Sequence, residues 1–313
     1  MSVKCYAESM PRWTVGVCVL ATLCVATPAT QVPSTVAAPA VASAATLVKH
    51  FLWTVTAPDA PTSYLMGALH VLTPEYYPLS PRIEQAFAAS KVLIEEADLD
   101  ELNDPATTKG LMGKAMLTDG RTLEQLIPGD LFAKVMERAD KLGLPRMAVQ
   151  RMKPWLVAIS LTAPTLQAAG FKPEHGVDKH FFDRAKKSGM PHRALETLAF
   201  QFDRLDQLSP VLQEALLRST IEEIDAQVSS IKSMAEAWSR GDVAAIEKLV
   251  PAATAPELHQ RLLVERNAAW VSAVDDCVKQ QTPCFIVVGA AHLVGPDSLV
   301  AMLQKKGYKV EQQ

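Results

Sequence analysis

This sequence of 313 residues has no large excess of charge of either sign, because it contains 31 Lys and Arg and 34 Asp and Glu. The formal net charge of -3 gives no electrostatic reason to expect a nucleic-acid partner. No run of basic residues is dense enough to indicate a patch that binds a membrane surface. The hydrophobic content of 49% is ordinary for a globular protein and sufficient for a large core.

Two well-known site motifs are also absent. The sequence contains no Gly-x-Ser-x-Gly, so it lacks the nucleophile elbow of a serine hydrolase. It contains no phosphate-binding glycine loop either. Any activity must therefore depend on other polar side chains.

The N-terminus has the order of a secretory signal peptide. A basic segment precedes a short apolar run at 14–26, and small residues suited to cleavage follow it. The run is too short to span a membrane comfortably. We expect a signal peptide at 1–29, an Ala- and Pro-rich leader at 30–45 and a folded domain at 46–313. The mature protein would then be periplasmic or secreted, with no stable membrane insertion after removal of the signal.

Cysteine is scarce, with five residues in the chain. Cys5, Cys18 and Cys24 fall in the segment that we expect to be removed. Cys277 and Cys284 remain, and an even pair in an exported chain favours a disulfide that closes a short loop. Two free thiols are the alternative.

The chain carries Gly-Ala-x-His twice, once near each end of the expected domain. "GALH" (67–70) follows one apolar run and "GAAH" (289–292) follows another. If each run is a strand that leads by a right-handed crossover into a parallel neighbour, both motifs lie at the same edge of a sheet. Ligands of such sheets bind at the carboxyl ends of the strands. We therefore expect His70 and His292 to converge on one site.

The surrounding pattern predicts an α/β fold. A hairpin at 51–69, a helix at 80–91 and a buried strand at 92–98 surround the first motif, and a helix and a closing strand follow the second. We expect a central sheet built from two βαβ-like halves, each with a GxxH loop. A mostly helical insertion at about 104–275 separates them, contains one more strand at 191–197 and is placed to cover the site.

The residue types indicate metal chemistry. Two neutral imidazoles with a carboxylate suit a divalent ion such as Mn, Co or Zn, which would activate water for hydrolysis. Glu96 is the nearest carboxylate, as a ligand or a general base, whereas Glu95 is expected to face the other side of its strand. Gly67 and Gly289 allow a ligand to approach the backbone closely. Histidines that only complete a hydrogen-bonded structure remain the alternative.

Longer stretches resemble the TraB/GumN family, to which the Tiki-type proteases are related. The resemblance covers essentially residues 50–311. It is carried by "YLMGALHVLTPEYYPLSPRIEQAFAASKVLIEEADL", "GVDKHFFDRAKKSG", "LETLAFQ", "ERNAAWV" and "FIVVGAAHLVGPDSLVAMLQKKGYKV". Tiki members are metal-dependent proteases, and the wider superfamily also includes esterases and a heme-binding protein. The resemblance implies a shared α/β fold and a site at the two GxxH loops.

Residue by residue, the resemblance implies that His70, His292 and Glu96 bind a metal or transfer protons. Arg266 would hold an oxyanion or a substrate carboxylate, with a helix salt bridge as its alternative. Asn267 and Glu196 are further candidates, and a helix cap is the alternative for Glu196.

Two functions follow from these residues. The first is an exported metal-dependent hydrolase, a peptidase, with a peptide or small molecule as substrate. The second is a periplasmic protein that binds and sequesters a peptide or a small ligand such as heme without turnover. His175, His180 and His192 lie outside the GxxH motifs and are expected to be structural or exposed.

Overall fold

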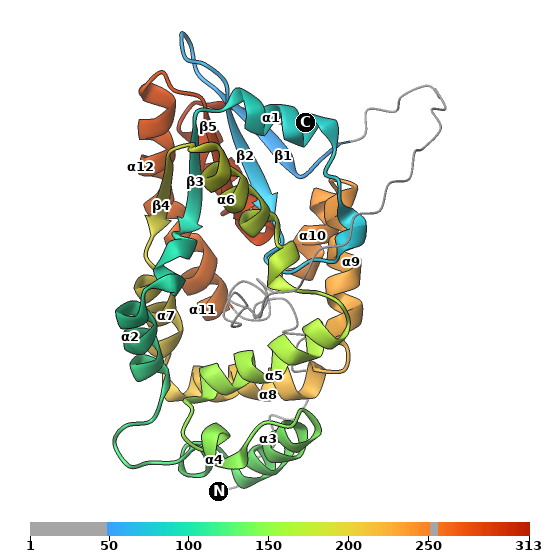
Figure 1. The fold of residues 1–313 in the computed structure, drawn as a ribbon, viewed down its shortest axis with the longest axis vertical. Helices are drawn as coiled ribbons and strands as arrows, with labels where there is room; N and C mark the ends of the chain where they lie inside the picture. Colours follow the sequence, from blue (N-terminus) through green and yellow to red (C-terminus); the bar gives the residue numbers. More distant parts are fainter. Residues whose placement is uncertain (1–48, 251–255) are drawn as a thin grey trace, which may run out of the picture.

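The computed structural model describes residues 49–250 and 256–313, so the expected signal peptide and leader lie outside the described residues. Figure 1 shows a six-stranded sheet at one end of the molecule and a group of helices at the other. The predicted α/β class is confirmed. Within the described ranges, no helix combines the length and apolar character needed to cross a membrane.

The sheet has the strand order β4-β3-β5-β2-β1-β6. Its strands are β1 (Leu52–Thr56), β2 (Ser63–Ala68), β3 (Val92–Ala97), β4 (His192–Glu196), β5 (Cys284–Gly289) and β6 (Lys309–Gln312). The predicted hairpin is the antiparallel pair β1 and β2. The strand β5 pairs in parallel with both β2 and β3, and β3 pairs in parallel with β4. The carboxyl ends of β2, β3, β4 and β5 therefore lie at one edge.

The two halves that carry the motifs are not equivalent. In the first half, β2 and β3 lie on either side of β5 and run parallel to it. In the second half, β6 pairs antiparallel with β1, which is itself antiparallel to β2. The strand β6 thus has the direction of β5, but β2 and β1 lie between the two. The repeated order of elements in the sequence does not correspond to a repeated arrangement of neighbouring strands.

Helices cover the sheet and form the rest of the molecule (Figure 1). They are α1 (Pro81–Ala89), α2 (Pro105–Ala115), α3 (Gly129–Lys141), α4 (Arg146–Val149), α5 (Pro154–Ala168), α6 (Val177–Ser188), α7 (Leu198–Asp206), α8 (Pro210–Glu223), α9 (Gln227–Ser239), α10 (Val243–Leu249), α11 (Pro256–His259), α12 (Glu265–Lys279) and α13 (Leu299–Lys305). The start of α1 agrees with the prediction: Ser80 caps it by accepting from the backbone of Ile83, and Pro81 is its first residue.

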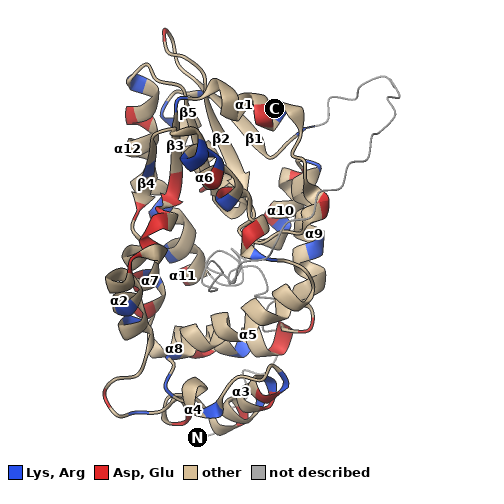
Figure 2. Ribbon diagram, in the orientation of Figure 1, with Lys and Arg blue, Asp and Glu red and all other residues tan. Residues whose placement is uncertain are grey.

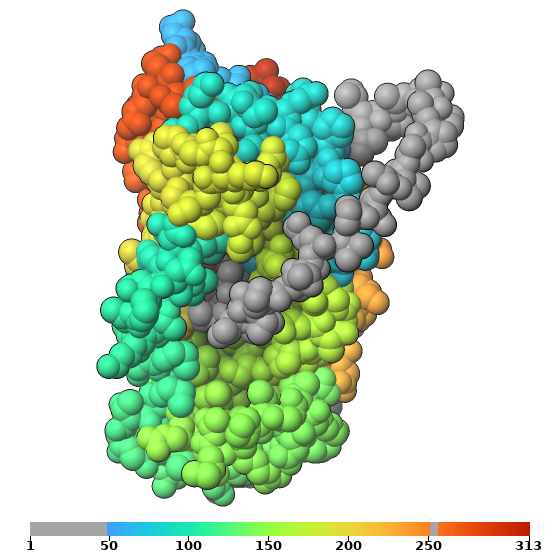
Figure 3. All heavy atoms as spheres, viewed as in Figure 1, coloured from blue at the N-terminus to red at the C-terminus, as the bar shows by residue number. Residues whose placement is uncertain are grey.

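Two hydrophobic clusters organise these elements. One surrounds the sheet and contains buried residues of β5 such as Phe285 together with Phe181 from α6. The other lies among the helices of the middle region and contains Trp155, Phe202 and Leu217. The helical region thus has a core of its own, separate from that of the sheet. On the face shown in Figure 3, residues of this region form the lower part of the molecule.

The predicted disulfide between Cys277 and Cys284 is present, with a distance of 6.5 Å between the two Cα atoms. Cys277 lies near the end of α12, and Cys284 is the first residue of β5. The bridge joins the helix that carries Arg266 to the strand that leads into the second GxxH motif.

Candidate functional site

The structure brings both GxxH histidines to one carboxylate. His70 follows β2, and His292 lies in the short turn η7 (Ala290–Leu293) after β5. The Nε2 atom of His70 is 4.0 Å from Oε1 of Glu96, and the Nε2 atom of His292 is 3.7 Å from the same oxygen. All three side chains are buried at the carboxyl edge of the sheet.

The loop of His70 is fixed against the start of α6. The backbone N–H of Val177 donates to the carbonyl of Leu69, with 3.0 Å between nitrogen and oxygen. Gly176 permits this approach, because a Cβ atom there would lie 2.5 Å from the carbonyl oxygen of His70. The contact places Asp178 beside the imidazole, and Oδ2 of Asp178 lies 2.8 Å from Nδ1 of His70.

This arrangement leaves Nε2 of His70 buried and without a hydrogen-bond partner, on the side of Glu96. Burial alone lowers the pKa of His70, but the carboxylates of Asp178 and Glu96 outweigh it and raise the pKa to about 9. Metal-binding histidines commonly have this arrangement, in which a carboxylate fixes one imidazole nitrogen and the other nitrogen is free to bind the metal.

Glu96 is held as a carboxylate by several donors. It accepts from the backbone N–H of Gly289 at 2.5 Å and from Nη2 of Arg266 at 2.6 Å. Burial raises the pKa of Glu96, but the positive charge of Arg266, the two neighbouring imidazoles and the Gly289 hydrogen bond lower it to about 2. Glu96 is therefore ionised at neutral pH.

Arg266 lies at the centre of the network and is only 2% exposed. Its guanidinium donates to Glu96 and, through Nε at 2.9 Å, to Glu196 at the end of β4. It also donates to the carbonyl of Leu262 and lies over the ring of Trp270, 4.7 Å from the ring centroid. Its ion pairs join α12 to two strands, so they are not pairs along the surface of one helix.

His292 has partners on both ring nitrogens and no solvent exposure. Its Nδ1 lies 2.6 Å from Oδ1 of Asn267, and its Nε2 lies 3.1 Å from Nη1 of Arg266. These partners imply that Nδ1–H donates to Asn267 and that Nε2 accepts from Arg266. Burial lowers the pKa of His292, and although Glu96 raises it, the positive charge of Arg266 helps to bring it to about 3. His292 is therefore neutral.

The further candidates Glu196 and Asn267 belong to the same network. Glu196 accepts from Arg266, from Nε1 of Trp270 at 3.1 Å and from Nε2 of Gln201 at 2.9 Å. Burial raises the pKa of Glu196 above its ordinary value, although Arg266 opposes this effect. Asn267 also donates to the carbonyl of Asp297 at 2.9 Å. These contacts fix Arg266 and His292 in place.

The two motif glycines have different surroundings. A Cβ atom on Gly289 would lie 3.0 Å from Nε2 of His70 and 3.2 Å from Oε1 of Glu96, inside the site. A Cβ atom on Gly67 would instead meet the ring of Phe51, 2.9 Å from Cε1, in the core. Gly289 therefore shapes the site itself, and Gly67 shapes the packing beneath its loop.

Comparison with known proteins supports the predicted resemblance. Residues 51–312 match the profile of the TraB/PrgY/gumN family. The chain belongs to this family. It is 26% identical to the uncharacterized protein YbaP of Shigella flexneri, over 82% of this chain and 94% of that protein. The Escherichia coli YbaP is 25% identical over the same shares.

A second group of relatives of this TraB/PrgY/gumN chain is named for an activity. Metalloprotease TIKI2 of Danio rerio is 24% identical over 83% of this chain, and the match spans 60% of that relative. Metalloprotease TIKI1 of Homo sapiens is 22% identical, and the match spans 61% of it. The chain thus corresponds to less than two thirds of the length of these metalloproteases. No solved structure matches the chain.

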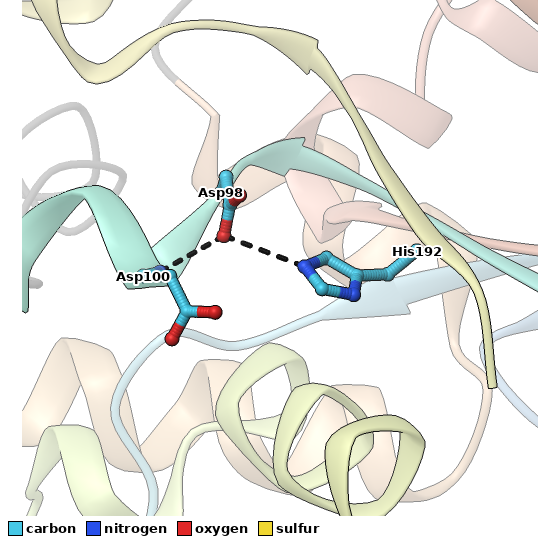
Figure 4. A group of neighbouring side chains, drawn as sticks. All are labelled: Asp98, Asp100 and His192. Atoms are coloured by element: carbon cyan, nitrogen blue, oxygen red, sulfur yellow. Dashed lines mark hydrogen bonds and ion pairs between the residues drawn. The ribbon is translucent and has the colours of Figure 1, made fainter. Parts of the chain in front are cut away.

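Another group of possible metal ligands lies at the end of β3. Figure 4 shows Asp98, Asp100 and His192, whose ligand atoms all lie within 4.8 Å of one another. In the described part of the chain this is the single such group of three, so the donor atoms of His70, Glu96 and His292 are more widely spread. The three side chains are partly exposed, and Asp100 forms an ion pair with Lys186.

Two residues at the site were not predicted as members of it. Asp178 is not among the predicted site residues, although "GVDKHFFDRAKKSG" carries part of the family resemblance. Glu95 was expected to face away, yet it lines a cavity with His70, Glu96 and Asp178. Both oxygens of its carboxyl group are buried without a hydrogen-bond partner. Burial and the nearby carboxylate of Asp178 raise the pKa of Glu95 to about 9.

Proposed function

We propose that this chain is an exported metal-dependent hydrolase that cleaves peptides at the edge of the sheet where His70 and Glu96 meet. One observation carries the proposal: Asp178 fixes Nδ1 of His70, and the free Nε2 faces an ionised carboxylate. The metalloprotease relatives support the same class of reaction.

The donor set suits a divalent ion such as Mn, Co or Zn, which imidazole and carboxylate ligands bind. Ligand atoms of Zn lie about 2.0–2.2 Å from the ion. The 4.0 Å between Nε2 of His70 and Oε1 of Glu96 is therefore compatible with a shared ion. His292 is a third candidate ligand, but its Nε2 must first lose the hydrogen bond from Arg266.

The residues around this position have separable roles. A bound divalent ion would supply an activated water and polarise a substrate carbonyl. Glu96 suits the role of ligand better than that of base, because a carboxylate with a pKa of about 2 takes up a proton poorly at neutral pH. Arg266 is fixed by two carboxylates and carries the positive charge that would stabilise a developing oxyanion.

Export is supported by two features. The basic segment and apolar run at the N-terminus are typical of a signal peptide. The disulfide Cys277–Cys284 is of a kind that persists in oxidising compartments. N-terminal sequencing of the protein recovered outside the cytoplasm should give a start after the apolar run, and a start at Met1 would contradict the proposal.

Metal analysis of the exported protein, followed by a peptide-library cleavage assay with and without chelator, tests the activity. We expect a bound divalent ion and cleavage that the chelator abolishes and added metal restores. His70→Ala should lose both, whereas His180→Ala, on a half-buried histidine outside the network, should retain both. Cleavage insensitive to chelator would contradict the metal role. Metal or ligand retention without cleavage of any peptide would favour the sequestering protein instead.

A further inference from the structure

Glu95 is a buried carboxyl group that the proposed chemistry does not use. It is 2% exposed, and neither of its oxygens has a hydrogen-bond partner. Oδ1 of Asp178 is likewise buried and unpartnered, whereas Oδ2 of the same residue is engaged with His70. Leaving buried acceptors unsatisfied costs stability, so such groups in one cavity indicate a ligand that donates to them.

The charge around Glu95 specifies the sign of that ligand. Four carboxylates exert the strongest charge effects on it, those of Asp178, Asp98, Asp183 and Asp100. Figure 2 shows acidic residues gathered at the carboxyl end of β3, where Glu95 lies. Asp183 and Asp100 form ion pairs with Lys179 and Lys186, and Asp178 is the aspartate of these four that lines the cavity with Glu95. A positively charged group placed there would interact with both carboxyl groups.

The remaining walls specify its shape. Apolar side chains complete the lining, from Ala97, Leu99, Leu198 and Val287. The cavity measures about 20 Å³, which accommodates a group of about the size of a water molecule. An ammonium group is of this size, and the carbon chain that carries it would continue out of the cavity past the apolar side chains.

A metal ion fits Glu95 less well. Glu95 belongs to no group of three metal-ligating side chains within 4.8 Å of one another among residues 49–250 and 256–313. Ligands lie about 2.0–2.6 Å from a divalent ion, so opposed donor atoms must be close. An ammonium group has three N–H donors that reach acceptors at about 2.8 Å, and it tolerates wider spacing.

We propose that Glu95 and Asp178 form a subsite for a primary ammonium group of the substrate, next to His70 and Glu96. This inference rests on the proposed function, because it assigns the substrate class of the same site: peptides with a free α-amino group or a lysine ε-amino group near the bond to be cleaved. Glu95 is then a specificity residue, and Asp178 serves both the ammonium and His70.

Binding of a simple amine tests the subsite without any requirement for catalysis. The probe is n-butylammonium chloride, titrated into the exported protein by calorimetry and by its effect on Tm, with sodium chloride at equal ionic strength and 1-butanol as controls. We expect saturable binding and a raised Tm with butylammonium alone, since a ligand that binds the folded state stabilises it. No saturable binding by the wild-type protein would overturn the proposal.

Glu95→Gln should weaken butylammonium binding by about tenfold or more, because a bound cation favours the ionised form of the Glu95 carboxyl group and an amide cannot ionise. Glu124→Gln is the matched control, because Glu124 is exposed and distant in sequence from the cavity, and it should bind as the wild type does. Equal affinity of wild type and Glu95→Gln would contradict the assignment. If Glu95→Gln does not fold, the wild-type comparison of butylammonium with 1-butanol still decides.

Matched peptides distinguish the two sources of the ammonium group. Each library peptide found to be cleaved is compared with its Nα-acetylated form and with its Nε-acetyllysine form. A rise in KM on only one of these changes identifies the α-amino or the ε-amino group, and unchanged KM on both contradicts the subsite. Cleavage without butylammonium binding would support the proposed hydrolase and contradict the ammonium subsite. Butylammonium binding without cleavage of any peptide would support the subsite and contradict the hydrolase.

Discussion

The two GxxH loops have the same motif and opposite electrostatics. His70 has a carboxylate on Nδ1, a free Nε2 and a pKa raised to about 9. His292 has an amide oxygen on Nδ1, a guanidinium on Nε2 and a pKa lowered to about 3. One imidazole is therefore prepared to carry a proton or to exchange it for a metal, and the other is a neutral acceptor.

The difference comes from the helix that packs against each loop. The loop of His70 meets the start of α6, which supplies Asp178. The loop of His292 meets α12, which supplies Asn267 and Arg266. The motif thus sets the position of each histidine, and a distant segment of the chain sets its charge.

The largest expected effect comes from Arg266, which connects the two halves of the site. Arg266→Met keeps much of the volume but leaves Glu96 and Glu196 as buried carboxyl groups without their cation. Removing one partner of a buried ion pair costs about 3–5 kcal/mol, so we expect a loss of this size in the free energy of unfolding, measured with urea.

Arg121→Met provides the control for this experiment. Arg121 and Asp119 form an ion pair in which both side chains are about half exposed, and solvent-exposed pairs of this kind contribute little to stability. Similar losses for Arg266→Met and Arg121→Met would show that Arg266 is not the central cation of the network.

Much of this arrangement was predictable from the sequence, because it depends on local signals. The apolar runs, the Ser80–Pro81 helix start and the hairpin predicted the elements of the sheet correctly. Parallel strands place their carboxyl ends together, so the meeting of His70, Glu96 and His292 followed from the order of the elements.

The partners of the histidines were not predictable in the same way. Asp178 lies 108 residues from His70 in the sequence, and no local spacing connects them. The position of β6 beside β1 was also hidden, because the sequence repeat suggested a neighbour of β5. Neighbouring side chains along a strand point to opposite faces, which predicts that Glu95 and Glu96 lie apart. Both residues nevertheless line the cavity, because it reaches the end of β3.

The next comparison is between Gly67 and Gly289, whose replacement should reduce stability less than Arg266→Met does. Gly67→Ala forces a Cβ atom into the ring of Phe51, which is 1% exposed, so we expect a loss of about 1–3 kcal/mol of stability. Gly289→Ala meets the ends of His70 and Glu96 instead, so it should alter metal retention more than stability. Urea unfolding and metal analysis of both variants measure the two effects. Equal stability losses with unchanged metal content would contradict the separate roles of these glycines.

The smallest effects on stability are expected from exchanging the partners of the two histidines, because Asp and Asn have nearly the same size and each variant keeps a hydrogen-bonding side chain beside the imidazole. Asp178→Asn gives His70 an amide partner, and Asn267→Asp gives His292 a carboxylate partner. Because the carboxylate of Asp178 raises the pKa of His70, the first change should lower it. The second should raise the pKa of His292, which burial and Arg266 hold low. Titration of the imidazole signals by NMR measures both changes.

The pH dependence of stability shows whether Asp178→Asn lowers or raises the pKa of His70. The folded-state pKa of His70, about 9, is above its ordinary value of 6.5. Its proton therefore stabilises the folded state fully below about pH 6.5, and this contribution is lost as the pH rises through 9. The stability difference between wild type and Asp178→Asn should accordingly shrink between pH 6.5 and pH 9. A difference that stays constant over this range would mean that Asp178 orients His70 without holding its proton, and the electrostatic contrast between the two loops would then depend on Arg266 alone.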